Sequence, residues 1–185
     1  GDRVIVESLM GPGVDPHLYQ ATQGDIRKLQ EADFVFYNGL HLEANMVKAF
    51  EQLGKEKPAL AIAEAIPEEK LLRDEEGAVD PHVWFDVDLW QTALEAAVEL
   101  LKKEVPQFAD ELEAGKRAYF GRLAELKEFA AVLAQLPEER RVLVTAHDAF
   151  GYFGRAHGIE VVGLQGLSTE DEVGMTDIER TIDLL

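Results

Sequence analysis

The sequence predicts an α/β protein in which two small lobes, each with a parallel-type sheet flanked by helices, are linked by one long spanning helix. Short strand patterns alternate with helical ones, and this alternation with short loops is typical of parallel sheets with right-handed crossovers. An apolar stripe then continues from Phe108 to Leu133 with a period of about 3.6 residues, which predicts a helix of roughly 40 Å. A small domain does not need a helix of that length, so we expect it to span two lobes.

The first lobe is placed at residues 1–105. Its first strand should end at the loop Gly11–Gly13, and Thr22 with Asp25 three residues later marks the start of a helix. The expected elements are strands over residues 4–9, 34–37 and 59–63, helices from Thr22, over 42–53 and over 87–104, and a loop over 66–81.

The linking helix is placed at residues 106–136 and a partial second lobe at residues 137–185. The second lobe should contain strands over residues 142–144 and 159–164, and helices over 149–156 and 175–185. The chain opens abruptly in a strand-like run, and its last helix has no strand after it. We therefore expect the lobes to be truncated at both ends.

The composition excludes several classes of function. The net charge is −18, from 36 acidic and 18 basic residues, and no basic cluster is available for a nucleic acid or an anionic membrane. The chain has no cysteine, so neither a disulfide framework nor a thiolate metal site can form. No apolar run has the length of a transmembrane helix.

Three of the five histidines lie in settings that indicate a metal site. The tetrapeptide Val-Asp-Pro-His occurs twice, ending at His17 and at His82, and His147 follows the predicted strand over residues 142–144. Proline stiffens each loop, and the preceding aspartate can hold the second imidazole nitrogen. The carboxyl ends of parallel strands are also where open α/β sheets collect ligands. Three neutral imidazoles that meet at one point suit Zn²⁺ and accept other divalent ions.

The other motifs give no comparable prediction. His157 is interpreted as a residue at a helix C-terminus, and His41 has no partner that the sequence identifies. Gly11-Pro12-Gly13 matches no phosphate-binding loop, and no serine lies in a nucleophile elbow.

Four ordered motifs carry a resemblance to a known family. The chain resembles the TroA-like metal-binding lipoproteins of manganese and zinc ABC importers, and the match covers essentially its whole length. The motifs are Gly11-Pro12-Gly13-Val14-Asp15-Pro16-His17-Leu18-Tyr19, Tyr37-Asn38-Gly39-Leu40-His41-Leu42-Glu43, Asp80-Pro81-His82-Val83-Trp84-Phe85-Asp86 and Thr145-Ala146-His147-Asp148-Ala149-Phe150-Gly151-Tyr152-Phe153.

The resemblance implies two α/β lobes joined by a rigid helix, with the metal ion at their interface. It implies that His17 and His82 come from the first lobe and His147 from the second. The family adds a carboxylate ligand from near its C-terminus, and we expect this fourth ligand to be absent from this chain. We also expect the family's first strand and helix to be missing. Sheet edges exposed in this way could pair two copies into a homodimer.

The function that the resemblance implies is that of a solute-binding protein and not of an enzyme. It would capture Mn²⁺ or Zn²⁺ between the lobes and deliver the ion to the membrane permease of an ABC importer. Its expected location is the periplasmic or extracellular face of the cell membrane, with a lipid anchor in the full-length protein. The acidic segment Glu68–Asp80 lacks histidine, which favours manganese, although nitrogen ligands bind Zn²⁺ more tightly than Mn²⁺.

Two alternatives remain open at this point. Three histidines with an open fourth position also describe a zinc-dependent hydrolase, in which Asp148 or Asp86 would act as general base. The chain could also be an adhesin or scaffold with a structural metal ion, serving cell adhesion.

Overall fold

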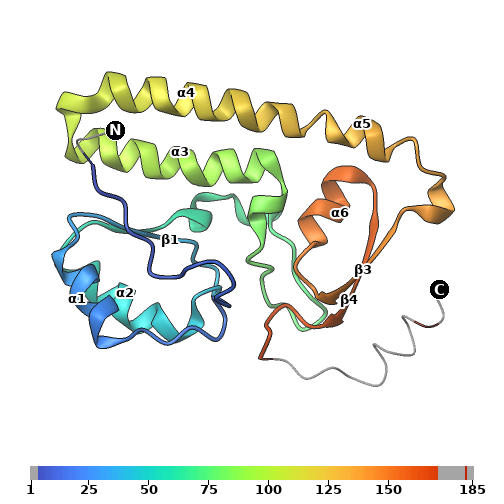
Figure 1. Ribbon diagram of the computed structural model, residues 1–185, viewed down its shortest axis with the longest axis horizontal. Helices are drawn as coiled ribbons and strands as arrows, with labels where there is room; N and C mark the ends of the chain where they lie inside the picture. The colour runs from blue at the N-terminus through green and yellow to red at the C-terminus, as the bar shows by residue number, and fades with distance from the viewer. Residues whose placement is uncertain (1–3, 171–181, 183–185) are drawn as a thin grey trace.

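Two parallel strand pairs, each accompanied by helices, form the framework of the protein (Figure 1). The structure is a computed structural model, and it describes residues 4–170 and residue 182. Strand β1 (Val35–Tyr37) pairs with β2 (Ala59–Ala61), and β3 (Val142–His147) pairs with β4 (Glu160–Gln165). Both pairs are parallel, which confirms the predicted α/β fold class.

The first strand pair packs against α1 (Gln23–Glu31) and α2 (Val47–Leu53). Helix α1 begins as predicted, because the Thr22 hydroxyl accepts from the backbone N–H of Asp25 and the Asp25 carboxylate accepts from that of Thr22. A small buried cluster joins these elements, and it comprises Leu29, Val35, Met46, Phe50 and Leu53.

The helix expected over residues 42–53 is shorter than predicted. Only Val47–Leu53 is α-helical, preceded by the 3-10 turn Ala44–Met46. Leu40 and His41 have left-handed backbone angles, with φ of 52° and 63°, which an α-helix cannot contain. The Glu43 carboxylate turns back to accept from the backbone N–H groups of Asn38 and Gly39, at 2.9 and 3.1 Å, and this contact replaces the first helical turn.

Helix α3 (Val87–Glu104) has the predicted boundaries. It begins where Asp86 accepts hydrogen bonds from the backbone N–H groups of Asp88 and Leu89. A second buried cluster lies under it and comprises Ile62, Ala63, Ile66, Val83, Leu89, Ala93 and Tyr152. Tyr152 comes from the far end of the chain, so this core already joins the two halves of the molecule.

The spanning segment is not one continuous α-helix. It consists of α4 (Ala109–Leu126) and α5 (Phe129–Leu133), with Lys127 and Glu128 in a tighter turn between them. The backbone N–H groups there bond three residues back, from Lys127 to Ala124 and from Ala130 to Lys127. Both turn residues keep right-handed angles, so α4 and α5 run in nearly one line above both strand pairs (Figure 1). The division into lobes at residues 1–105, 106–136 and 137–185 stays a prediction.

The second strand pair packs against α6 (Gly151–His157), which ends at Gly158 with a left-handed φ of 65°. Strand β3 extends past the predicted residues 142–144 and ends at His147. The short 3-10 helices η1 to η6 are Ala44–Met46, Ile62–Ala65, Glu68–Lys70, Val83–Phe85, Pro106–Phe108 and Glu138–Arg140.

Two further expectations at the chain ends have different outcomes. The strand expected over residues 4–9 is wrong: Val4, Ile5 and Val6 are 68%, 89% and 88% exposed, and they pair with no strand of the described chain. A strand needs a neighbour for its backbone groups, and none lies beside this run in the part described. The helix expected over residues 175–185 falls almost entirely outside the described residues. None of the helices within residues 4–170 combines the length and the apolar composition needed to cross a membrane.

Candidate metal centre

His17 lies in the loop before α1 and is held by its neighbours. The Asp15 carboxylate accepts from the backbone N–H of His17 at 2.9 Å, which fixes the turn around Pro16. The side-chain amide of Asn45 donates to the His17 carbonyl at 3.1 Å. His17 is buried, with 5% of its surface exposed, so its side chain is packed into the protein although Val14 and Leu18 of the same loop are exposed.

His82 lies in the second Val-Asp-Pro-His loop, directly before η4 and α3. The same carboxylate oxygen of Asp80 accepts from the backbone N–H of His82 at 2.9 Å and lies 2.7 Å from its ring nitrogen Nδ1. Because a carboxylate only accepts, the Nδ1 atom carries the proton and Nε2 keeps its lone pair. The aspartate of the tetrapeptide therefore has the role that the sequence predicted for it.

His147 is the last residue of β3 and pairs in register with Gln165 of β4. Its Nδ1 atom lies 2.8 Å from the carbonyl oxygen of Gly166, which follows β4. A carbonyl oxygen also only accepts, so the His147 proton lies on Nδ1 and the lone pair on Nε2. The carboxyl end of the second strand pair thus presents His147 to the rest of the site.

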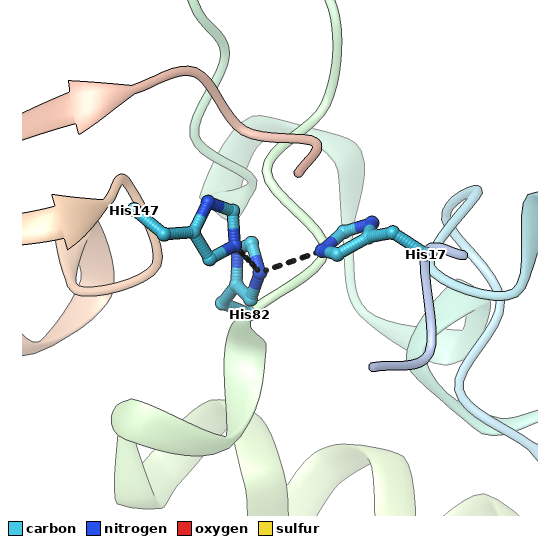
Figure 2. Close-up of side chains that lie close together, drawn as sticks. All are labelled: His17, His82 and His147. Atoms are coloured by element: carbon cyan, nitrogen blue, oxygen red, sulfur yellow. Dashed lines mark hydrogen bonds between the residues drawn. The ribbon is translucent and has the colours of Figure 1, made fainter. Parts of the chain in front are cut away.

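The three imidazoles converge, although His17 and His147 each lie 65 residues from His82 in sequence (Figure 2). The Nε2 atom of His82 lies 3.3 Å from that of His17 and 3.2 Å from that of His147. All three ligand atoms lie within 4.8 Å of one another. Two nitrogens on one tetrahedral ion, at about 2.0–2.1 Å each, would be separated by roughly 3.3 Å. The separations of His82 from His17 and from His147 fit a single metal ion.

The electrostatics of the cluster also favour a cation. The Nε2 atoms of His82 and His147 both carry lone pairs, and lone pairs 3.2 Å apart repel each other unless a cation or a proton lies between them. Within the described residues, no carboxylate completes the cluster, which comprises His17, His82 and His147.

The cluster opens into a pocket of about 270 Å³. Apart from the histidines, it is lined mainly by apolar and aromatic groups, among them Leu42, Trp84, Phe85, Ala149 and Phe150. Asp15 and Thr169 complete the wall, and their side chains meet where the Thr169 hydroxyl donates to the Asp15 carboxylate at 2.7 Å. An apolar wall keeps water away and strengthens the attraction between a bound ion and its ligands.

Asp15 stays ionised beside the cluster. Its burial would raise the pKa, but the hydrogen bonds from Thr169 and from the backbone, together with the nearby His17 ring, outweigh that effect and lower the pKa of Asp15. A carboxylate therefore remains close to His17 and favours a cation in the pocket.

The remaining residues considered from the sequence lie elsewhere. His41 is exposed on its left-handed turn, and His157 ends α6, as its position before Gly158 predicted. Asp86 caps α3 and pairs with Arg155 at 3.3 Å. Neither Asp86 nor Asp148 is among the described residues that line the pocket.

Three supporting residues were not identified from the sequence. The Tyr152 hydroxyl donates to the Asp80 carbonyl at 2.8 Å, the Asn38 amide donates to the Pro81 carbonyl at 3.0 Å, and Asn45 holds the His17 loop. Asn38 and Tyr152 both fall within the quoted motifs, but a motif does not tell which backbone group a side chain will reach. Their contacts arise only when distant segments pack together.

Comparison with known proteins agrees with this geometry. The family model of the zinc-uptake complex component A periplasmic (ZnuA) matches residues 1–185. The manganese-binding lipoprotein MntA of Bacillus subtilis (strain 168) is 48% identical over 187 residues, which cover 100% of this chain and 61% of that protein. The zinc-binding protein TroA of Treponema pallidum (strain Nichols) is 50% identical over 177 residues, which cover 95% of this chain and 58% of that protein.

Solved structures show the same fold. The periplasmic zinc-binding protein TroA from Treponema pallidum superposes with a TM-score of 0.90 at 49% identity, over 96% of this chain and 64% of that one. Fe(III)-bound YtgA from Chlamydia trachomatis superposes with a TM-score of 0.86 at 28% identity, over 100% of this chain and 70% of that one. The chain spans about three fifths of the length of the curated relatives MntA and TroA, at 61% and 58%. With a family match along its whole length, the chain belongs to the ZnuA family of periplasmic zinc-uptake components.

Proposed function

We propose that this protein captures Mn²⁺ or Zn²⁺ at His17, His82 and His147 and delivers the ion to the permease of an ABC importer. The observation that carries the proposal is the convergence of three imidazole Nε2 atoms within 4.8 Å, with His82 and His147 held in the tautomer that ligates. One relative is named for manganese and another for zinc, which supports a divalent transition metal as the cargo.

The proposed location is the periplasmic or extracellular face of the cell membrane, with a lipid anchor on the full-length protein. The description of the family as periplasmic and the naming of MntA as a lipoprotein support this location. A binding protein at that face can collect ions from outside the membrane and present them to the importer.

The chemistry of the ligands predicts that zinc binds more tightly than manganese in vitro. Three imidazole nitrogens are the donors, and the affinity of nitrogen sites rises steeply from Mn²⁺ to Zn²⁺. The cargo inside the organism depends also on which ion is available there. We therefore propose both ions as cargo and expect Zn²⁺ to displace Mn²⁺ in solution.

Binding is favoured over hydrolysis by the positions of the two candidate general bases. Asp86 is engaged at the start of α3 and by Arg155, and in the described chain neither Asp86 nor Asp148 lines the pocket. A general base must reach the water on the metal ion directly or through one further water molecule. Neither of these two candidate bases is therefore positioned in the described pocket to activate water.

Calorimetric titration with Zn²⁺ and Mn²⁺ tests the proposal. Changing a residue that only hydrogen-bonds a metal ligand typically lowers the metal affinity about 10–100-fold. His17→Ala, His82→Ala and His147→Ala each remove a ligand itself, so each should lower the affinity by more than that. His41→Asn is the matched control, because it removes an exposed imidazole from a left-handed position that asparagine tolerates. Its affinity should equal that of the unaltered chain.

Two results would contradict the proposal. Unchanged affinity in all three alanine variants would remove the metal site from these histidines. Steady turnover of an ester substrate that a chelator abolishes would instead support the hydrolase.

A further inference from the structure

A tyrosine outside the histidine cluster connects two of its three members. Tyr152 lies on α6, is 0% exposed and belongs to the buried cluster beneath α3. Its hydroxyl donates to the Asp80 carbonyl at 2.8 Å and accepts from the backbone N–H of Leu72 at 3.0 Å. A single side chain from the second half of the chain thus satisfies backbone groups of two segments of the first half.

The contact with Asp80 leads directly to His82. The Asp80 carboxylate holds both the backbone N–H and the Nδ1 atom of His82, at 2.9 and 2.7 Å. The start of α6 contacts the same carboxylate: a Cβ atom at Gly151 would lie 3.0 Å from Asp80 Oδ2. Helix α6 therefore supports Asp80 at its carbonyl, through Tyr152, and at its carboxylate, through the close approach of Gly151.

Helix α6 is tied equally closely to His147. Three residues separate His147 from Gly151, and the backbone N–H of Asp148 donates to the Gln165 carbonyl at 2.9 Å. Gly163 of β4 lies so close to Asp148 that a Cβ atom there would be 2.7 Å from the Asp148 Cα atom. This short connection has little freedom, so a shift of α6 would move His147 as well.

We propose that Tyr152 is a positioning residue of the metal site, which holds the Asp80–His82 loop against α6 and so sets the distance between His82 and His147. The inference rests on the proposed function, because it concerns the geometry of that same site. The Nε2 atoms of His82 and His147 lie 3.2 Å apart, and their separation depends on how α6 and the loop fit together. Rigid support of this kind is what keeps ligands at the spacing that an ion requires.

The protonation of Tyr152 suits this role. Burial raises the pKa of Tyr152 to about 12. Its hydroxyl therefore keeps its proton and continues to donate to Asp80 throughout the range in which neutral imidazoles bind a metal ion.

The first test replaces Tyr152 with phenylalanine, which removes the hydroxyl and keeps the ring in the core. Zn²⁺ affinity, measured by competition with a chromophoric chelator, should fall about tenfold, the scale seen when a residue that holds a ligand is lost. The absorption spectrum of bound Co²⁺, which reports the ligand geometry, should change as well. Tyr119→Phe is the control, because it removes the hydroxyl of a tyrosine on α4 that is 38% exposed.

The second test leaves the hydroxyl in place and disturbs the packing of α6 against Asp80 at the carboxylate instead of the carbonyl. Gly151→Ala adds a methyl group 3.0 Å from Asp80 Oδ2 and should also weaken Zn²⁺ binding and alter the Co²⁺ spectrum. Gly115→Ala is its control, because the corresponding methyl group on α4 meets nothing within 4 Å. This variant keeps the inference testable if Tyr152→Phe does not fold.

The outcomes separate this inference from the proposed function. If Tyr152→Phe folds and lowers stability but leaves the Zn²⁺ affinity and the Co²⁺ spectrum unchanged, Tyr152 is a core residue only and the inference is wrong. If Tyr152→Phe keeps its Zn²⁺ affinity while His82→Ala loses most of it, the proposed function still holds. If the unaltered chain fails to bind Zn²⁺, the proposed function itself is overturned and the inference with it.

Discussion

At the scale of single residues, the candidate site depends on the hydrogen-bond acceptors that contact the Nδ1 atoms of His82 and His147. The Asp80 carboxylate and the Gly166 carbonyl accept hydrogen bonds from the Nδ1 atoms of His82 and His147, so the Nε2 atoms of these two rings face each other as acceptors. The ionised Asp15 adds a negative charge nearby. A proton and a metal ion therefore compete for the same place between the rings.

This competition predicts that metal affinity falls as the pH is lowered. An imidazole must be neutral to ligate, and histidine side chains ordinarily gain their proton near about pH 6.5. The affinity for Zn²⁺ should be constant at the alkaline end of a series from about pH 8 to 5 and should decline steadily towards the acidic end. Calorimetry in buffers of different ionisation enthalpy would count the protons released on binding. An affinity that does not change across this series would contradict ligation by imidazoles.

At the scale of elements, carboxylates shape the loops that present the histidines. Asp15 and Asp80 each accept from the backbone two residues later, and Glu43 accepts from the backbone of Asn38 and Gly39. Asn38 in turn donates to the Pro81 carbonyl, next to His82. The turn that replaces the start of the expected helix thus supports the loop of the candidate metal site.

Glu43 predicts a particular dependence of stability on pH. Burial raises the pKa of Glu43 above its ordinary value of 4.5, although the hydrogen bonds from Asn38 and Gly39 act in the opposite direction. Because the folded state then holds the proton more tightly, the contribution of Glu43 to stability is complete below pH 4.5 and is lost as the pH rises through the folded pKa.

The variant Glu43→Gln tests this dependence. It removes the titration and one of the two acceptors, which should cost about 1–3 kcal/mol. The unfolding free energy of the unaltered chain minus that of the variant, from denaturant titrations, should decrease with rising pH above 4.5. Glu51→Gln, at an exposed position of α2, is the control. If this difference in unfolding free energy increased with pH, it would contradict a raised pKa of Glu43 in the folded state.

The elements that the sequence predicted well are those with local determinants. Helix α3 was predicted from its apolar periodicity, and α1 from the spacing of Thr22 and Asp25, which form a reciprocal contact in the structure. The helix predicted over residues 42–53 was too long, because the Glu43 carboxylate accepts hydrogen bonds from backbone N–H groups that precede it in the sequence. The turn at Lys127 was also missed. Its backbone hydrogen bonds span three residues and not four, and this change leaves the apolar stripe in the sequence unchanged.

At the scale of the whole molecule, the site lies where the two halves of the chain are fastened together. Tyr152 belongs to the buried cluster beneath α3, Arg155 pairs with Asp86 at 3.3 Å, and the Thr169 hydroxyl donates to the Asp15 carboxylate at 2.7 Å across the pocket. The sequence indicated the three histidines through the repeated tetrapeptide and the strand end. It could not indicate these cross-contacts, because they depend on packing between segments tens of residues apart.

Self-association of the protein is also a property of the whole molecule, and it stays a prediction. Each sheet has two strands in the described chain, so both strands of each pair are edge strands, and the exposed run Val4–Val6 adds unpaired β-branched residues. The net charge of −18 opposes the approach of two copies, and salt screens that repulsion. We therefore expect a monomer at low concentration and a growing dimer population at high concentration, more so in high salt.

Size-exclusion chromatography with light scattering measures this equilibrium. Ile5→Lys places a charge on the exposed run, where Ile5 is 89% exposed, and should shift the population back to the monomer. Val132→Lys, which adds the same charge on α5 at a residue that is 55% exposed, should leave the equilibrium as it is in the unaltered chain. If both variants increase dimerisation equally, the smaller net charge and not the run at residues 4–6 controls association. A constant monomer mass at every concentration and salt level would exclude pairing through the sheet edges altogether.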